Sequence, residues 1–133
     1  MTENDFLGLQ GEFSNPEPGV YEKSFHLFRV KELALYFNYE KGDESMVVIE
    51  PLIQNKRLGD GVWYALGLAK SINPIRFDPY FIKLTDPDGV GEQFQSALPH
   101  CVNGTLMKIR VTFRDLNGGS EGSLTVGVVE NQL

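Results

Sequence analysis

Strict alternation of apolar and polar residues over 105–114 is the feature that most constrains the fold of this chain. Its apolar members are Met107, Ile109, Val111 and Phe113, and the residues between them are Lys108, Arg110, Thr112 and Arg114. Because successive side chains of a β-strand point to opposite faces, this pattern predicts a half-buried antiparallel strand. Leu124, Val126 and Val128 repeat the alternation beyond the loop DLNGGSEG at 115–122. We therefore predict a hairpin over 105–129.

A second hairpin is predicted over 33–53. Its first strand carries an apolar face, made by Leu33, Leu35, Phe37 and Tyr39. A turn signal at 41–44 follows, and the segment 45–53 is rich in Val and Ile, as expected of a return strand. Pro51 lacks a backbone donor, so it predicts a sheet edge or a bulge in that strand.

The remaining segments also favour short strands rather than helices. Strands are expected at 24–30, 62–68, 80–85 and around 92–97, although 65–72 is equally compatible with a helical turn. No segment of helical length has a continuous apolar stripe. Seven or eight short strands separated by turn residues predict an all-β protein, a sandwich or a barrel. We favour an antiparallel β-sandwich with jelly-roll-like or Greek-key connections.

Residues 1–20 are predicted to form an irregular N-terminal arm before a single sandwich domain at 21–133. Glycine, proline and asparagine interrupt any regular pattern in this segment, at Gly8, Gly11, Asn15, Pro16, Pro18 and Gly19. The arm also carries apolar residues, namely Phe6, Leu7, Leu9 and Phe13. Two interpretations stay open: the arm crosses to a neighbouring subunit, or it folds back on its own sandwich.

Charge and composition exclude several classes of partner. The 133 residues include 12 Lys and Arg against 18 Asp and Glu, a net charge of −6. Nucleic acids and anionic membrane surfaces are bound chiefly through basic side chains, so neither is expected as a partner. Cys101 is the single cysteine and excludes an intramolecular disulfide. Neither a transmembrane segment nor a secretory signal is apparent, which fits synthesis in a reducing cytoplasm.

The sequence predicts no catalytic residue, no cofactor and no metal site. His100 and Cys101 are adjacent, and chain neighbours on a strand point to opposite faces, which opposes a catalytic pair. His26 lies within a predicted strand, where it is expected at a sheet surface. The DPDG turn at 86–89 lacks the further ligands of a calcium loop. The acidic pairs Asp43 with Glu44 and Glu40 with Glu50 are interpreted as solvated hairpin residues rather than as glycosidase carboxylates.

The segment 33–65 has an aromatic strand and a turn, then an apolar strand and a Trp-Tyr pair; its distinctive residues are Tyr39, Lys41, Gly42, Asp43, Glu44, Ser45, Trp63 and Tyr64. In this pattern it resembles small structural proteins of tailed bacteriophages. The resemblance implies a non-enzymatic virion component, such as a capsid decoration protein or a head or tail accessory subunit. Such a protein would self-associate, bind other subunits such as the major capsid protein, and reside in the virion after assembly in the host cytoplasm.

Two other functions remain as alternatives. Trp63 and Tyr64 form a concentrated aromatic spot that would suit a carbohydrate- or ligand-binding sandwich. A small hydrolase would require His26, His100 and acidic residues to converge in one pocket. The candidate partner-binding residues are therefore Phe6, Leu7, Leu9 and Phe13 of the arm, which could contact a neighbouring subunit, together with Trp63 and Tyr64.

Overall fold

The computed structural model describes residues 4–27, 30–54, 61–65, 70–72, 79–83, 105–116 and 118–132. These residues form ten strands and no helix. The strands are β1 (Asp5–Leu7), β2 (Glu12–Glu17), β3 (Val20–Leu27), β4 (Val30–Glu40), β5 (Met46–Gln54), β6 (Tyr64–Ala65), β7 (Lys70–Ile72), β8 (Pro79–Lys83), β9 (Thr105–Arg114) and β10 (Ser123–Gln132). Within these ranges there is no helix long and apolar enough to span a membrane.

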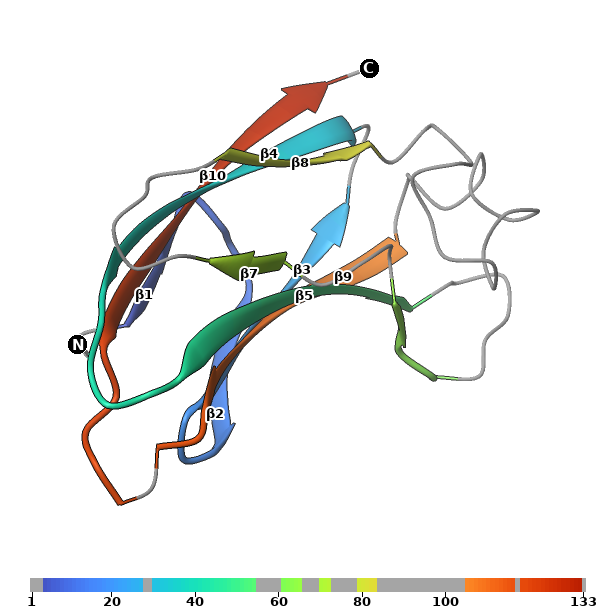
Figure 1. Ribbon diagram of the computed structural model, residues 1–133. Coiled ribbons are helices and arrows are strands. Elements are labelled where there is room, and N and C mark those ends of the chain that lie inside the picture. The colour runs from blue at the N-terminus through green and yellow to red at the C-terminus, as the bar shows by residue number, and fades with distance from the viewer. Residues whose placement is uncertain are drawn as a thin grey trace.

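The strands form two sheets that face each other (Figure 1). A four-stranded sheet has the order β1-β10-β4-β8, and a six-stranded sheet has the order β2-β3-β9-β5-β6, with β7 also pairing with β5. Neighbouring strands are antiparallel except β1 and β10, which are parallel. The predicted all-β sandwich is therefore confirmed.

Successive strands repeatedly change sheet. β3 belongs to the six-stranded sheet, β4 to the four-stranded sheet and β5 to the six-stranded sheet again, and β8, β9 and β10 alternate in the same way. Connections of this kind, which wrap a chain around two stacked sheets, are jelly-roll-like.

Both predicted hairpins are wrong as pairings, although their strands are present. β4 pairs with β10 and β8, whereas β5 pairs with β9, β6 and β7. The loops at 41–45 and 115–122 are therefore β-arches, which carry the chain from one sheet to the other. The alternation of apolar and polar residues identifies the buried face of a strand, but it does not identify the partner strand. The same pattern arises when the next strand in the chain pairs within the same sheet and when it lies in the facing sheet.

The core lies between the two sheets and includes the apolar faces that the alternation predicts. From β4 it takes Leu35, Phe37 and Tyr39, and from β9 it takes Met107, Ile109, Val111 and Phe113, all buried. Leu124 and Val126 of β10 are also buried, while Val128 is half-buried and packs against the core. Burial of two apolar sheet faces against each other is the main stabilising contribution in a sandwich of this kind.

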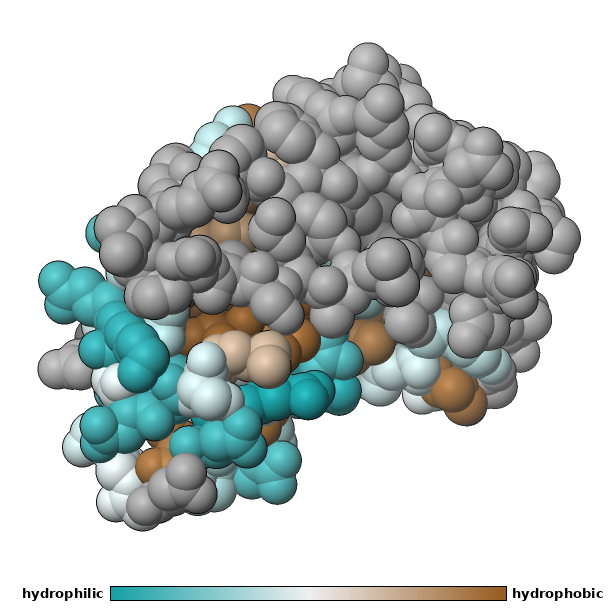
Figure 2. Space-filling view, in the orientation of Figure 1, coloured by the Kyte–Doolittle hydropathy of each residue, from teal (hydrophilic) through white to brown (hydrophobic). Residues whose placement is uncertain are grey.

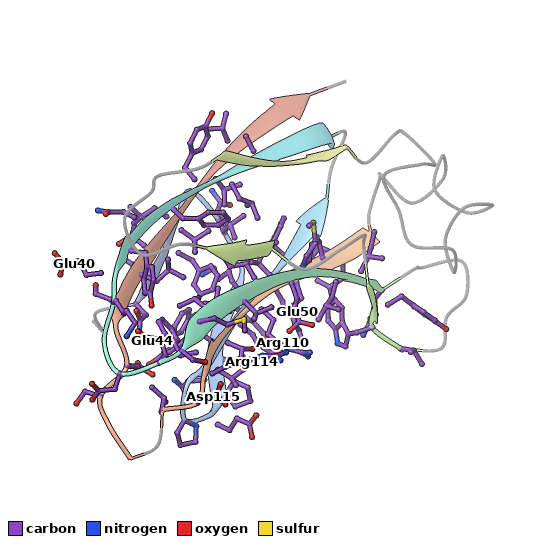
Figure 3. The ribbon with its side chains drawn as sticks, viewed as in Figure 1. Glu40, Glu44, Glu50, Arg110, Arg114 and Asp115 are labelled. Carbon is purple, nitrogen blue, oxygen red and sulfur yellow. The ribbon has the colours of Figure 1, made fainter. Side chains whose placement is uncertain are left out.

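A buried carboxylate joins the two arches. Glu44 is completely buried in the first arch and accepts hydrogen bonds from the Tyr39 hydroxyl (2.7 Å), the Gly42 amide (2.6 Å) and the Gly122 amide of the second arch. Asp43 donates its amide to the Ser120 carbonyl oxygen at 2.8 Å. The arches therefore lie side by side at one end of the sandwich, where hydrophilic side chains gather on the described surface at the lower left of the view (Figures 2 and 3).

The prediction of an irregular N-terminal arm is wrong. β1 adds to the four-stranded sheet beside β10, and β2 adds to the six-stranded sheet beside β3. Gly8 and Gly11 lie between the two strands, and Pro18 and Gly19 form the turn after β2, so the residues that interrupt the pattern are at connections. Pro16 falls at the register shift of β2 between Ser14 and Glu17, at the outer strand of its sheet, where a missing donor is tolerated. The segment thus folds back on its own sandwich.

Three further predictions concern β5 to β8. The prediction of a sheet edge or a bulge at Pro51 is wrong, because β5 is an interior strand and its register with β9 continues through Pro51. The missing donor is tolerated because Pro51 lies between the residues that pair with β7 and those that pair with β6. The open choice over 65–72 is resolved in favour of strands where the structure describes it, at β6 and β7. The strand expected around 92–97 lies outside the described residues.

Candidate ligand-binding site

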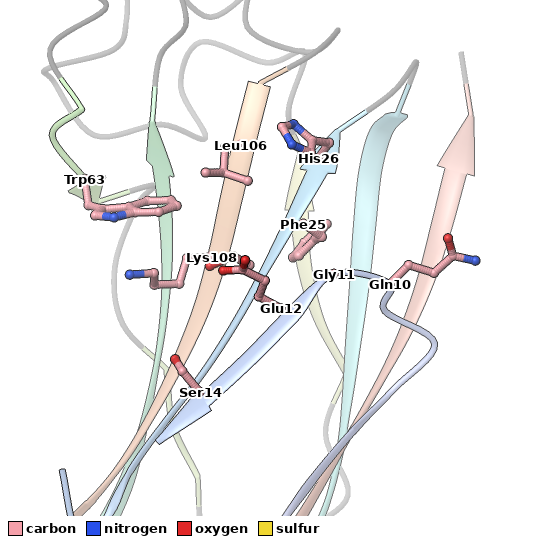
Figure 4. Close-up of a pocket in the computed structure, with 10 residues that line it drawn as sticks. Gln10, Gly11, Glu12, Ser14, Phe25, His26, Trp63, Leu106 and Lys108 are labelled. Atoms are coloured by element: carbon pink, nitrogen blue, oxygen red, sulfur yellow. The ribbon is translucent and has the colours of Figure 1, made fainter. Parts of the chain in front are cut away.

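A hollow of about 630 Å³ lies on the outer face of the six-stranded sheet, and we call it the trough (Figure 4). The described residues that line it are Gln10, Gly11, Glu12, Ser14, Ser24, Phe25, His26, Trp63, Leu106 and Lys108. Its side chains point outward, because His26 and Lys108 alternate along their strands with the buried Phe25 and Met107. This volume is within the range of small-molecule sites.

Two paired strands form the floor of the trough. In the register of β3 with β9, Ser24 is opposite Lys108 and His26 is opposite Leu106. Side chains directly opposite each other on one face of an antiparallel pair are close neighbours. The floor therefore presents a hydroxyl, an imidazole and an ammonium group beside one apolar side chain.

β2 forms one wall, and Gly11 sets its distance from the floor. The backbone of Gly11 has a φ of +127°, and a Cβ atom there would stand 3.0 Å from the Ser24 carbonyl carbon and closer still to its oxygen. Only glycine permits this approach. Glu12, which is opposite Ser24 in the register, and Ser14 then lie along the trough on the same side of β2 (Figure 4).

Trp63 forms the opposite wall and is held by charge. The Lys108 ammonium lies 4.2 Å from the centre of the Trp63 ring, in a cation–π contact. The same ammonium is 3.4 Å from Glu22, which also accepts a hydrogen bond of 2.6 Å from Arg110. The indole is thus connected, through Lys108, to a buried carboxylate.

The arrangement combines a flat aromatic surface with side chains that both donate and accept hydrogen bonds. Gln10, Ser14, Ser24 and His26 supply amide, hydroxyl and imidazole groups. Lys108 and Glu12 give the lining one basic and one acidic side chain, and Lys108 also contacts Glu22. Such a surface is suited to a polar, uncharged ligand with an apolar face.

The six predicted partner-binding residues do not form one surface. Phe6 and Leu9 are buried in the core, so they are not available to a partner in this structure. Leu7 and Phe13 are 51% and 43% exposed but belong to different sheets. Trp63 is half-buried and lines the trough, whereas Tyr64 packs against the core cluster.

The residues considered for catalysis are not brought together where the structure describes them. Glu44 is buried while Asp43 is exposed, and Glu40 and Glu50 belong to different sheets (Figure 3). His26 is exposed, as expected at a sheet surface, and lines the trough. His100, Cys101 and the turn at 86–89 lie outside the described residues. Across the described part of the chain, no group of three or more His, Cys, Asp and Glu side chains is placed to hold a metal ion.

Sequence reasoning missed most of the trough. Gln10, Glu12 and Ser14 fell in the segment expected to be irregular, and Lys108 was assigned only to a solvent-facing strand surface. The alternation that marks Lys108 as outward was visible, but its neighbours come from β2, β3 and residue 63. The lining residues come together only through the strand register and the pairing of β2 with β3. That pairing was not predicted, because the glycines at 8, 11 and 19 made the segment look irregular.

No family model matches this sequence, and no curated protein matches it. Among solved structures, one described as "CBM4 structure and function" is similar, with a TM-score of 0.46 and 15% sequence identity. The similarity covers 84% of this chain and 61% of that chain.

Proposed function

We propose that this protein is a non-catalytic binding domain that holds a neutral carbohydrate in the trough. The observation that carries the proposal is the Trp63 ring, which contacts Lys108 and lines the trough together with hydrogen-bonding side chains. A sugar ring has an apolar face that packs on an aromatic surface and hydroxyl groups at its edge that need donors and acceptors. The trough supplies both.

Charge supports a neutral ligand over an anionic one. The cationic group on the floor, Lys108, is engaged by Glu22 and by the indole. Glu12 adds a negative charge at the wall, and the chain as a whole carries −6. An acidic ligand would therefore meet repulsion rather than an available cation.

Tryptophan fluorescence tests the proposal, because Trp63 is the single tryptophan of the chain. We would titrate the protein with soluble neutral polysaccharides of glucose, xylose, mannose or galactose. At least one is expected to change the emission of Trp63 in a saturable manner. A flat response to every polymer, together with no heat of binding by calorimetry, would contradict the proposal.

A pair of variants separates loss of the site from loss of stability. Trp63→Ala is expected to weaken binding at least tenfold, measured by calorimetry because the fluorophore is removed. Phe13→Ala is the control, since it also removes an aromatic ring, one that contacts Phe6 and Tyr21 away from the trough. It is expected to lower stability and leave the affinity for the sugar unchanged.

A second candidate function, the self-associating virion subunit, is favoured by a different surface. Leu7 of β1 and Val129 of β10 are each 51% exposed on the outer face of the four-stranded sheet. Leu7 is opposite Gly127, which shares its face with Val129, so the two apolar side chains lie near each other. Exposed apolar patches on soluble proteins often mark contacts between subunits.

Sedimentation tests this second candidate. If the surface joins copies of the chain, the protein sediments as a defined oligomer, and the double variant Leu7→Ser with Val129→Ser sediments as a monomer. A wild-type protein that stays monomeric at high concentration and does not bind assembled phage shells would count against it.

A further inference from the structure

A second hollow, of about 400 Å³, lies on the same outer face as the trough. The described residues that line it are Pro16, Glu17, Val20, Glu22, Glu50, Arg110 and Thr112. The outward-facing side chains of β9 line first the trough and then the second hollow. Leu106 and Lys108 belong to the trough, and Arg110 and Thr112 belong to the second hollow.

The two hollows share one boundary, which is an ion-paired group rather than an apolar ridge. Lys108 from the trough and Arg110 from the second hollow both contact Glu22, at 3.4 and 2.6 Å. Glu22 is also two positions from Ser24 on β3, so the side chains of both hollows follow the same two strands. From Leu106 to Thr112 the strand rises about 20 Å, at about 3.4 Å for each residue.

We propose that the trough and the second hollow are consecutive subsites for one linear neutral oligosaccharide that lies along β3 and β9. This inference rests on the proposed function and adds the shape and length of the ligand. A ring stacked on Trp63 would occupy the trough, and units further along the chain would cross the ion-paired boundary. The combined surface is longer than a single sugar unit.

The second hollow has the chemistry that such units require. Glu17 and Glu50 accept hydrogen bonds from sugar hydroxyls, and Thr112 both donates and accepts. Arg110 is opposite Glu50 in the register of β5 with β9 (Figure 3). Its guanidinium group is paired with Glu22. Across the two hollows the carboxylates of Glu12, Glu17, Glu22 and Glu50 outnumber the two cations, Lys108 and Arg110, which disfavours an anionic polymer.

The test compares ligands of different length. For the neutral polymer that changes the emission of Trp63, we would measure the affinities of its fragments from the disaccharide to the hexasaccharide by calorimetry. The proposal predicts that affinity rises at least tenfold across the series and then levels off. A single-site trough predicts one affinity for every fragment beyond the shortest.

Variants of the second hollow locate the additional contacts. Thr112→Val removes a hydroxyl at nearly constant shape, and Glu50→Gln removes one charge. Each is expected to weaken the hexasaccharide severalfold and to leave the disaccharide unchanged. Thr125→Val is the matched control, because Thr125 lies on the other sheet, between the inward-facing Leu124 and Val126, and both affinities should be unaffected.

The outcomes distinguish the two claims. Binding without dependence on length, and with no effect of either variant on the hexasaccharide, overturns the linear-ligand inference and leaves the trough as the site. Absence of binding to every polymer contradicts the proposed function, and the inference falls with it. A length dependence reduced by Thr112→Val or Glu50→Gln, and unaffected by Thr125→Val, supports both.

Discussion

The carboxylate of Glu44 is held inside the sandwich by hydrogen-bond donors. Three donors meet it, the Tyr39 hydroxyl and the amides of Gly42 and Gly122, and Gly122 is 78 residues away along the chain. A buried charge is costly unless its oxygens are fully hydrogen-bonded. In this way one residue of the first arch fixes the backbone of both arches.

Replacing Glu44 by Gln should lower the free energy of unfolding by about 2 kcal/mol, because an amide NH₂ would face a backbone donor and leave it unsatisfied. Urea denaturation of the variant and the wild type measures the difference. The matched control is Glu40→Gln, since Glu40 is exposed at the end of β4. Equal stability of the Glu44→Gln variant and the wild type would contradict this account of the arches.

Tyr39 is expected to make the stability of the folded protein decrease at alkaline pH. Burial, and then the hydrogen bond to Glu44 and its negative charge, raise the pKa of Tyr39 above the usual value of about 10. Below that value the phenol is protonated in both the folded and the unfolded chain, so its contribution to stability is complete. Above it the unfolded chain loses the proton first, and stability falls as pH rises toward the folded-state pKa.

The variant Tyr39→Phe should therefore be less stable than the wild type at pH 8 and lose less stability between pH 8 and pH 11. Denaturation at several pH values measures both effects. Tyr21, whose pKa is also raised by burial and by Glu121, keeps part of the alkaline dependence in the variant. Identical slopes for the two proteins would show that Tyr39 does not carry the linkage.

The two β-arches define the topology because they carry the chain from one sheet to the other. Their packing against each other requires that their backbones approach closely. A Cβ atom on Gly122 would stand 2.7 Å from the Gly42 nitrogen and closer still to the Glu40 carbonyl oxygen. Backbone atoms on both sides leave no side chain free to move aside. The arches are therefore packed against each other more tightly than any residue but glycine permits.

Gly122→Ala should destabilise the protein by at least about 2 kcal/mol, the size expected of overpacking at a rigid site. Gly127→Ala is the control on the neighbouring strand, because its Cβ would meet atoms no nearer than 3.9 Å, which is ordinary contact. Thermal unfolding of both variants compares them. If Gly122→Ala is as stable as Gly127→Ala, the arches are less rigidly packed than described.

At the scale of elements, the sequence predicts the positions of strands and their buried faces well, but it does not predict which strands pair. The alternation in β9 identified its buried residues correctly, because burial of one face leaves a local period of two. The strands that pair with β4 and β5 could not be predicted, because the pairing depends on the two arches. The arches are joined by the hydrogen bond from the Gly122 amide to Glu44, two residues that are far apart in the sequence. The two strands at the N-terminus were missed because glycine and proline at their ends looked like a continuous interruption.

At the scale of the whole molecule, the two outer faces differ in character. The six-stranded sheet presents the trough, the Glu22 ion pairs and the second hollow, whereas the four-stranded sheet presents Leu7 and Val129. The aromatic spot at Trp63 was visible in the sequence, so part of the candidate site was predictable. The side chains around it were not, because they converge from strands that pair across about 80 positions of the chain, such as β3 and β9.

Mapping the backbone amides by nuclear magnetic resonance during titration with the neutral oligosaccharide tests the central claim most directly. Our account predicts that the largest shift changes fall on Gln10–Ser14, Ser24–His26, Trp63 and Leu106–Lys108, and also on Arg110–Thr112 when the oligosaccharide is long enough to reach the second hollow. Little change is expected on the four-stranded sheet. Changes centred on Leu7 and Val129, or no changes at saturating sugar, would contradict it.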